Sequence, residues 1–214
     1  MEKGNTKQEI LEKALELFSV RGYEATSISQ IAEAVGIRKA SLYSHFGSKQ
    51  DILDALIRET LEQYEKHSIF ARADFDDPNY TKKISGLTPD GAVKMILAHV
   101  VFILHDPQIS RSRKMLTIEQ FRNKTLSELQ TKHNYTDVMH FFTKLVRFLI
   151  DSGELMDNNP EAVAAQLCLP ISVWINLCDR EPEREEEIMS LIERHIREFF
   201  RLYGRADNKT QKGI

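Results

Sequence analysis

The sequence of 214 residues has only two cysteines and no long apolar run. Cys168 and Cys178 fall in one expected helix, and at about 100° per residue they lie on different faces, so a disulfide between them is not expected. No uninterrupted apolar stretch approaches the roughly 18 residues of a membrane span. The first ten residues also lack the apolar centre of a secretory signal. We therefore expect a cytoplasmic protein with no membrane partner.

The alternating apolar and polar pattern of a half-buried strand is also missing. Nearly every segment has helical periodicity instead, and some begin with a capping side chain before proline, as at Asp106-Pro107 and Asn159-Pro160. The expected fold class is therefore all-α, with residues 71–88 as a loop. The expected helices cover residues 6–22, 27–35, 39–46, 48–70, 89–105, 107–121, 124–133, 136–152, 160–179 and 183–203.

Signatures of catalysis and of metal binding are scarce. The sequence has no nucleophile elbow, no phosphate-binding glycine loop and no carboxylate–histidine metal set, so an enzyme built on a helical bundle is a poor alternative and no cofactor is expected. His99 and His105 would lie about 120° apart around a helix, and no cysteine or carboxylate cluster completes a metal site with them or with His140. We expect neither an enzyme nor a metal sensor.

Residues 22–46 have the pattern of a helix-turn-helix. Two short helices that cross steeply need a small residue at the crossing, which Ala32 supplies. Four residues later the turn needs a residue that tolerates positive φ, and Gly36 meets that need. The residues expected to anchor both helices to one core are Ile28, Ile31, Val35, Leu42 and Phe46.

Basic residues are concentrated in the second of these helices. From Gly36 to Lys49 there are two lysines, one arginine and no acid, a formal charge of +3 in a chain whose net charge is −3. A basic run alone is usually a solvated surface, but inside a gapless helix-turn-helix pattern it favours contact with DNA phosphates and base edges. The outward candidates are Arg38, Lys39, Ser41, Tyr43, Ser44, His45 and Lys49, together with Thr26 and Ser27 at the start of the preceding helix.

Three stretches in fixed order carry a resemblance: Arg-Gly-Tyr, then Ala-Thr-Ser-Ile-x-x-Ile-Ala-x-x-x-Gly, then Lys-Ala-Ser-Leu-Tyr-x-His-Phe-x-Ser-Lys. Over residues 8–56 the chain resembles the TetR family of bacterial regulators. The resemblance implies a helix-turn-helix domain at residues 1–50 and a helical ligand-binding and dimerisation domain at 51–204. The polar residues 205–214 are expected to form a flexible tail. It further implies phosphate contacts from Tyr43, His45 and Lys49, base or phosphate contacts from Lys39, Ala40 and Ser44, and support from Thr26, Ser27 and Arg38. Ala40 stands where many members have glycine, so the approach to the bases could differ slightly.

The last two helices are expected to form a homodimer. The final helix has an apolar stripe, and the helix before it is apolar nearly all round, so two such helices and their symmetry mates could form a four-helix bundle. Burial within one chain is the alternative. Two recognition helices about 34 Å apart would also read a palindromic operator, whereas one buries too little surface. The expected interface residues are Val173, Leu177, Ile188, Leu191, Ile192, Ile196 and Phe199.

Aromatic, histidine and methionine side chains in the central helices could line a pocket for a small, largely apolar effector. For any one of them, ordinary core packing is the commoner explanation. The candidates are His99, Phe102, Met115, Phe121, His140, Phe142 and Trp174. The function expected from the sequence is a DNA-binding transcriptional repressor that a small molecule releases from its operator. The alternative is a DNA-binding dimer of the same fold that acts without a ligand.

Overall fold

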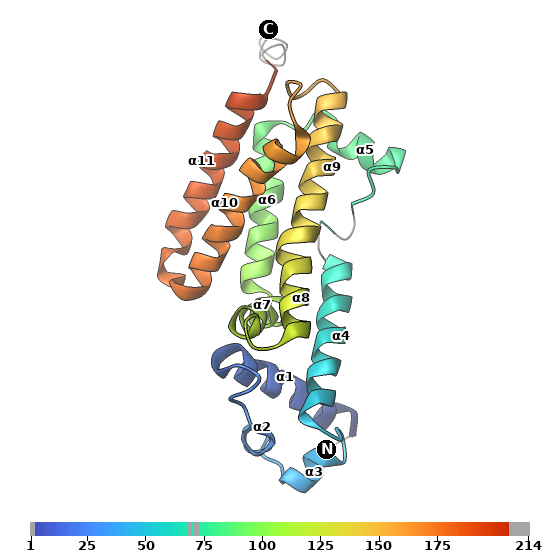
Figure 1. Ribbon diagram of the computed structural model, residues 1–214, viewed down its shortest axis with the longest axis vertical. Coiled ribbons are helices and arrows are strands. Elements are labelled where there is room, and N and C mark those ends of the chain that lie inside the picture. The colour runs from blue at the N-terminus through green and yellow to red at the C-terminus, as the bar shows by residue number, and fades with distance from the viewer. Residues whose placement is uncertain (1–2, 68–69, 71–72, 206–214) are drawn as a thin grey trace. The chain divides into compact units, whose positions relative to one another are not determined.

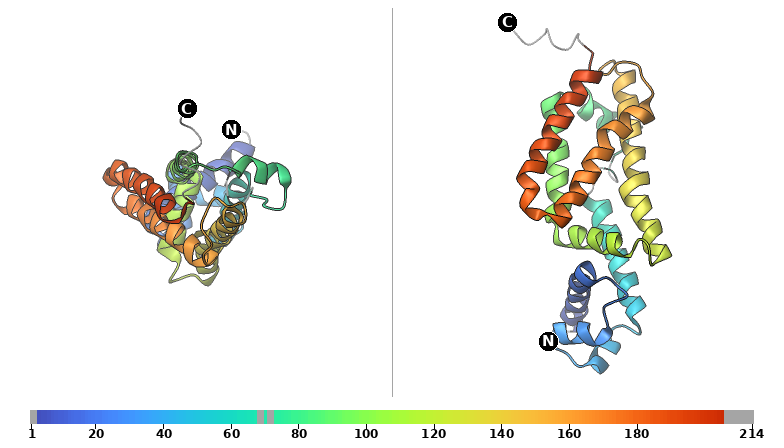
Figure 2. Two further views of the ribbon diagram at one scale, coloured as in Figure 1. Left: turned by 90° about the horizontal axis from the view of Figure 1, so that it is seen from above. Right: turned by 60° about the vertical axis from the view of Figure 1, so that its left-hand side comes forward.

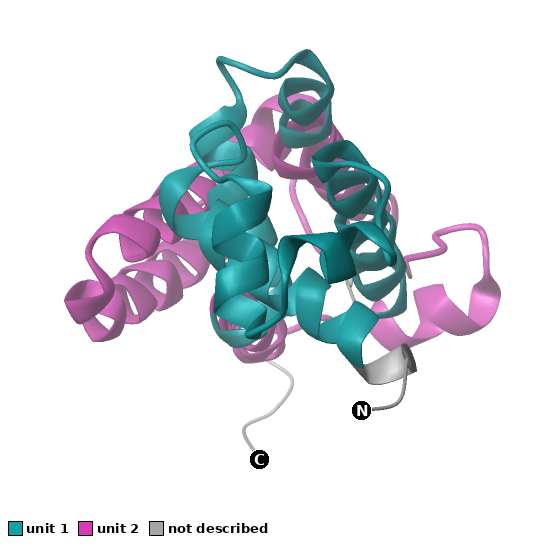
Figure 3. Cartoon of the chain, turned by 90° about the horizontal axis from the view of Figure 1, so that it is seen from below, with its two compact units in different colours: residues 1–68, 105–131 teal, residues 69–104, 132–214 magenta. Residues whose placement is uncertain are grey.

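The computed structural model describes residues 3–67, 70 and 73–205, and its regular secondary structure over these ranges is helical. An isolated bridge between Leu155 and Gly204 accompanies the helices, and no strand is formed in the described residues. The expected all-α class is confirmed. The chain divides into two compact units, which Figure 3 colours separately: unit 1 comprises residues 1–68 and 105–131, and unit 2 comprises residues 69–104 and 132–214. Most of the expected tail, residues 206–214, lies outside the described residues.

In its described residues, unit 1 contains the expected helix-turn-helix and four further helices (Figure 1). Its elements are α1 (Lys3–Arg21), α2 (Ile28–Val35), α3 (Lys39–Tyr43), α4 (Lys49–His67), α7 (Pro107–Glu119) and α8 (Lys124–Thr131). Helix α1 packs against α2, α4 and α7. Phe18 of α1 and Leu42 of α3 are both fully buried in the core of this unit, which also takes in Met115 of α7 and Leu126 of α8.

Helix α4 is joined to α7 as well as to the helix-turn-helix. The hydroxyl groups of Thr60 in α4 and Ser112 in α7 lie 2.8 Å apart and share a hydrogen bond. One hydrophobic core joins α1–α4 to α7 and α8. Unit 1 therefore includes residues beyond the domain boundary expected at residue 50.

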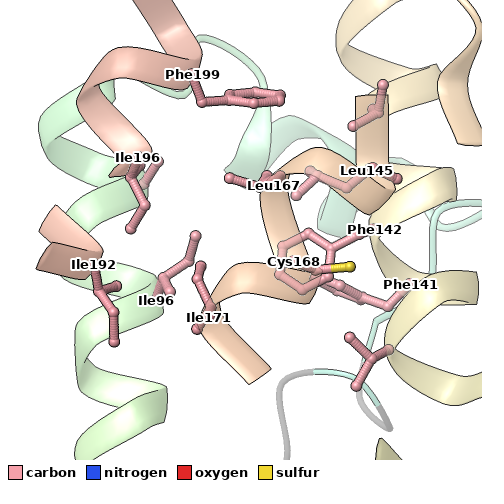
Figure 4. Packing of buried hydrophobic residues seen from close by; sticks show 14 of the residues in the cluster. Ile96, Phe141, Phe142, Leu145, Leu167, Cys168, Ile171, Ile192, Ile196 and Phe199 are labelled. Atoms are coloured by element: carbon pink, nitrogen blue, oxygen red, sulfur yellow. The ribbon is translucent and has the colours of Figure 1, made fainter. Parts of the chain in front are cut away.

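Unit 2 is a helical bundle. Its elements are α5 (Pro78–Ile84), α6 (Pro89–His105), the π-helical turn η1 (Lys132–Thr136), α9 (Asp137–Asp151), α10 (Pro160–Arg180), the 3₁₀ turn η2 (Pro182–Arg184) and α11 (Glu185–Tyr203). Helix α10 packs against both α9 and α11, and the further views in Figure 2 show it running beside these two helices. Figure 4 shows Ile96 of α6, Ile171 of α10 and Ile192 of α11 directed into one shared core.

Helix α10 is long and apolar enough to cross a membrane by length and composition alone. In unit 2 its apolar side chains are used for packing, since Leu167, Cys168 and Ile171 are all buried in the bundle core (Figure 4). Both cysteines are free and buried. The core of unit 2 therefore accounts for the buried part of the apolar surface of α10, which is 39% of its most apolar stretch.

One expected loop is wrong. Residues 71–88 contain helix α5, which begins where the Asp77 carboxylate accepts a hydrogen bond from the Asn79 backbone N–H at 2.8 Å, with Pro78 in the first turn. The helix ends before Gly86, whose φ of 73° is left-handed. The start signal, a capping side chain before proline, is the one that predicts the start of α6 correctly, but α5 has only seven residues and so too few turns for a periodic pattern.

Candidate functional site

The turn between α2 and α3 has the geometry that the sequence predicts. Ser27 caps α2, since its hydroxyl accepts a hydrogen bond from the Gln30 backbone N–H while the Gln30 side chain accepts one from the Ser27 N–H. At the other end Gly36 adopts a φ of 76° and donates its N–H to the last turn of α2. Ala32 is buried at the crossing, with 2% of its surface exposed. These contacts confirm the roles predicted for Ala32 and Gly36.

The apolar side of the helix-turn-helix is fully anchored. All five residues predicted to hold it are buried: Ile28, Ile31, Val35, Leu42 and Phe46. Because Leu42 occupies the single inward position of the short helix α3, the other side chains of α3 are directed away from the core. The sequence prediction of the buried stripe is confirmed, and it fixes which face of α3 is free.

The free face of α3 is basic and hydroxyl-rich, and we call it the α3 face. Its exposed members are Arg38, Lys39, Ala40, Ser41, Tyr43 and Ser44, and the half-buried His45 follows them. The Lys39 ammonium lies 6.0 Å from the centre of the Tyr43 ring, so cation and phenol share one surface. The α3 face thus brings together charge, hydroxyl donors and an aromatic ring without an acidic residue among them.

Lys49 has a structural role that the sequence analysis missed. Its ammonium group donates hydrogen bonds to the backbone carbonyls of Tyr23 at 2.9 Å and Thr26 at 3.1 Å, and it lies 4.1 Å from the centre of the Tyr23 ring. The Tyr23 hydroxyl in turn donates to the Gln50 side chain at 3.1 Å. Lys49 therefore connects the start of α4 to the α1–α2 turn. Its ammonium group uses two of its three N–H donors in these hydrogen bonds, so one N–H remains for another partner.

The two hydroxyls before α2 differ in exposure. Thr26 is buried, and its hydroxyl donates to the Gly22 carbonyl at 2.8 Å, so this side chain supports the turn from inside. Ser27 is exposed. Of the two residues expected beside a phosphate, Ser27 alone presents its side chain to solvent.

The α1–α2 turn also packs closely against the end of α7. Gly22 adopts a φ of 87°, and a Cβ at this position would overlap the side-chain carboxylate of Glu119 and touch Ile118. Glu119 is fully buried, and within the described part of the chain its two carboxylate oxygens have no hydrogen-bond partner. The Arg-Gly-Tyr stretch signals a tight turn, but no sequence pattern predicts Glu119 as the residue that requires glycine there.

Three of the seven expected pocket residues belong to one aromatic cluster of unit 2. His99 and Phe102 lie 6.2 Å apart between ring centres, and Phe142 joins them through Phe70. Trp174 packs elsewhere in unit 2, with its ring 5.3 Å from that of His195.

The remaining expected pocket residues do not share a site with this cluster. Met115 is buried in the core of unit 1, and Phe121 and His140 are exposed, Phe121 to 91%. Residue type alone does not show which of the two hydrophobic cores a side chain joins. Of the seven expected pocket residues, only His99, Phe102 and Phe142 therefore remain together as candidates. Within the described ranges, no group of three or more histidine, cysteine, aspartate or glutamate side chains is placed to hold a metal ion.

The residues expected at a dimer interface also divide into two groups. Ile188, Ile192, Ile196 and Phe199 face the core of their own bundle, so they are not available to a partner. Val173 is 64% exposed, and Leu177 and Leu191 are partly exposed. The apolar stripe of α11 correctly predicts a buried face, but the chain itself covers that face. Leu202, which is 50% exposed, is an outward apolar residue that the stripe did not single out.

The capped α2, the glycine turn and the outward α3 face define a helix-turn-helix protein. Residues 10–56 match the family model described as "Bacterial regulatory proteins, tetR family". The chain is 44% identical over 52 residues to the biofilm operon negative transcriptional regulator IcaR of Staphylococcus aureus, a match that covers 24% of this chain and 28% of IcaR. It is 32% identical over 137 residues to the transcriptional repressor KstR2 of Mycobacterium tuberculosis, a match that covers 62% of this chain and 64% of KstR2.

Solved structures extend the similarity to the whole fold. SmeT, the repressor of the Stenotrophomonas maltophilia multidrug efflux pump SmeDEF, superimposes with a TM-score of 0.63 at 15% identity over 97% of this chain and 94% of SmeT. A complex of SmeT with triclosan is also similar, with a TM-score of 0.59 at 19% identity over 98% of this chain and 96% of that one. The matched segments span less than two thirds of IcaR and KstR2. Residues 10–56 are thus similar to the tetR family of bacterial regulatory proteins, and the chain as a whole shares its fold with SmeT.

Proposed function

We propose that this protein is a cytoplasmic, sequence-specific DNA-binding repressor that acts as a homodimer on a palindromic duplex operator. A small, largely apolar effector releases it from the operator. The observation that carries the proposal is the α3 face, on which cationic and hydroxyl side chains are exposed on a helix anchored from behind by Leu42. Such a helix can enter a major groove without disturbing the core that holds it.

The chemistry of the α3 face suits a nucleic acid better than a protein partner. Three cations and no acid between Gly36 and Lys49 favour a polyanion, in a chain whose net charge of −3 excludes general attraction to DNA. Lys39 and Ser44 are exposed and can reach base edges, while Tyr43, His45 and the third N–H of Lys49 serve phosphates.

The short length of helix α3 supports a dimer. Helix α3 has five residues and can contact only a few base pairs, so specific affinity needs a second copy one helical turn of DNA away. Val173 of α10 and Leu202 of α11 are large apolar side chains exposed to solvent, which supports a partner at these helices.

Repression is proposed from the relatives, since IcaR, KstR2 and SmeT are all named as repressors or negative regulators. Control by an effector is proposed from the aromatic cluster of unit 2 and from the triclosan complex of SmeT. The effector would have to bind one conformation better than the other, and a coupling of about 1–3 kcal/mol would change operator affinity roughly 5- to 150-fold. A dimer without an effector is the second candidate, because the Phe70 ring fills the space between His99 and Phe141.

The proposal is tested by selecting bound sites from random duplex DNA and titrating the selected duplex at several salt concentrations. We expect an inverted repeat, together with affinity that falls steeply with salt. Lys39→Ala should weaken binding and change the selected sequence. The matched control is Lys124→Ala, which removes the same charge from α8 and should leave the selected sequence unchanged. Selection of no sequence, with no binding even at low salt, would contradict the proposal.

A further inference from the structure

Helix α3 has one row of side chains that lies directly opposite its buried side. Successive residues of a helix are about 100° apart around the axis, so Ala40 and Ser44 both lie about 160° from Leu42, one on each side of the outward direction. Ser44 continues the helical path, since its φ of −74° and ψ of −15° are right-handed. Both residues are exposed, whereas Leu42 is fully buried. We call Ala40 and Ser44 the outermost row of α3.

The outermost row consists of short side chains between two flanks. Lys39 and Tyr43 lie on one flank, about 60° and 100° from Leu42, and Ser41 lies on the other, about 100° from it. A methyl group and a hydroxymethyl group allow the backbone of α3 to approach the edges of bases closely. The outermost row would therefore meet the floor of a major groove, while the flanking side chains extend toward its two sides.

The hydroxyl group of Ser44 is already used as a donor within α3. It donates a hydrogen bond to the backbone carbonyl of Ser41 at 2.7 Å. A hydroxyl has one proton to donate and two lone pairs that accept, so Ser44 presents only acceptors to a partner outside the helix. The donors on base edges in the major groove are the amino groups of adenine and cytosine, whereas guanine and thymine present acceptors there. Ser44 is therefore complementary to adenine and cytosine and opposed to guanine and thymine.

The methyl group of Ala40 can distinguish bases only by apolar contact, because it has neither a donor nor an acceptor. The C5-methyl group of thymine is the apolar group that the major groove offers. Ala40 and Ser44 are one helical turn apart, about 6 Å along the axis of α3. Base pairs follow one another about every 3.4 Å, so the bases that the two side chains contact are at most about two base-pair steps apart.

We propose that the outermost row of α3 selects the bases of the operator by hydrogen-bond direction and by methyl contact. Ser44 accepts a hydrogen bond from the amino group of an adenine or a cytosine, and Ala40 contacts the methyl group of a thymine within two base-pair steps of that base. The inference rests on the proposed function, since it names the bases that the DNA-binding surface reads. Neither contact involves a charged side chain, so neither should contribute to the salt dependence of binding.

The test uses the full-length protein and the duplex selected from random DNA, in which single bases of one half-site are replaced by analogues that lack one group. Uracil in place of thymine removes the C5-methyl group. Unsubstituted purine in place of adenine, or 2-pyrimidinone in place of cytosine, removes the amino group. We expect one thymine at which uracil weakens wild-type binding about threefold, as for one methyl group that leaves an apolar contact. Within two steps of it, loss of one amino group should weaken binding about fivefold.

Two variants assign these sensitivities to the two side chains. Ala40→Gly should lose the sensitivity to uracil and keep the sensitivity to the missing amino group, and Ser44→Ala should show the reverse. Each sensitivity is a ratio of affinities for two duplexes on the same protein, so a change in the stability of a variant cancels. An effect of the analogue on base pairing alone would be equal in the wild type and in Ser44→Ala, and that result overturns the proposal.

The matched control is Ser41→Ala. It removes an exposed hydroxyl group from the flank of the same helix and keeps the backbone carbonyl that accepts the Ser44 proton. Ser41→Ala should therefore retain both sensitivities of the wild type, and loss of the amino-group sensitivity in this variant overturns the assignment to Ser44. If a variant does not fold, the scan of the wild type still decides, because wild-type affinity that is indifferent to every replacement overturns the proposal.

Failure of the inference differs from failure of the proposed function. No binding of any duplex would refute the proposed function and this inference with it. Salt-dependent binding of a selected duplex, without a methyl-sensitive thymine lost in Ala40→Gly and an amino-sensitive base lost in Ser44→Ala, would refute this inference alone.

Discussion

Substitution of Lys49 can separate a structural role from a DNA-binding role, because the two roles affect different measured quantities. Its ammonium group donates to the Tyr23 and Thr26 carbonyls and lies over the Tyr23 ring, so Lys49→Ala removes two charge-assisted hydrogen bonds and a cation–π contact. Hydrogen bonds of charged groups contribute about 1.5–3 kcal/mol each when buried. Because Lys49 is half-buried, we expect a total loss of roughly 2 kcal/mol after allowance for solvent screening.

This loss should lower the melting temperature by about 4–8 °C for a protein of this size. Lys49→Ala should also reduce the slope of log affinity against log salt by about 0.9 for each protomer, and so by roughly 1.8 for a dimer on the selected duplex, the change expected for the loss of one phosphate contact per protomer. Lys49→Met keeps the aliphatic stem against Tyr23, so it should recover part of the stability but none of the salt slope. Differential scanning calorimetry and fluorescence anisotropy measure the two quantities separately.

The control for Lys49 is Lys124→Ala. The Lys124 side chain is 92% exposed and its ammonium group lies 3.8 Å from Glu128, so its removal should change neither stability nor salt slope measurably. If Lys49→Ala has the same melting temperature as the wild type, the stabilising role of Lys49 between α4 and the α1–α2 turn is refuted. An unchanged salt slope would instead refute the phosphate contact.

Three further predictions concern the turns, the buried histidine and base reading. Gly36→Ala should cost about 1–2 kcal/mol in urea unfolding from its positive φ alone, and Gly22→Ala should cost more, because a Cβ there also meets a buried carboxylate; equal costs would contradict this reading. The folded-state pKa of His99, about 4, lies below its unfolded value near 6.5, so the unfolded chain binds more protons between these pH values. Stability should therefore fall by roughly 3 kcal/mol as pH drops through that window, and His99→Phe should remove this component of the pH profile; a variant with the wild-type profile would exclude His99 as its source. Ser44→Ala, like Lys39→Ala, should change the preferred bases in site selection, and unchanged preference would count against base reading by these side chains.

The helix-turn-helix could be predicted almost completely from the sequence because its determinants are local. Gly36 is needed for backbone conformation, Ala32 for a steep crossing, and Leu42 for the inward side of α3; each requirement acts within a few residues. Helix α6 was likewise predicted at its observed bounds, Pro89–His105, since proline at its start and a long apolar period mark it. Local signals of this kind can be recognised in the sequence without knowledge of tertiary contacts.

Features that depend on which surfaces meet could not be predicted. The stripe of α11 indicates that Ile188 and Ile192 are buried, but periodicity is the same whether a face packs on its own chain or on a partner. Met115 similarly belongs to the core of unit 1, although its residue type alone suggested a pocket shared with the aromatic residues of unit 2. The Lys49 contacts join residues more than twenty positions apart, and no short motif encodes the carbonyls that receive them.

The most direct test of the whole account is the salt dependence of binding to the selected duplex by the wild-type protein. We predict a straight, negative dependence of log affinity on log salt, with a magnitude of several phosphate contacts per dimer and a clear loss in Lys39→Ala. Affinity that does not change with salt, or no affinity for any double-stranded oligonucleotide, would contradict the claim that the α3 face binds DNA.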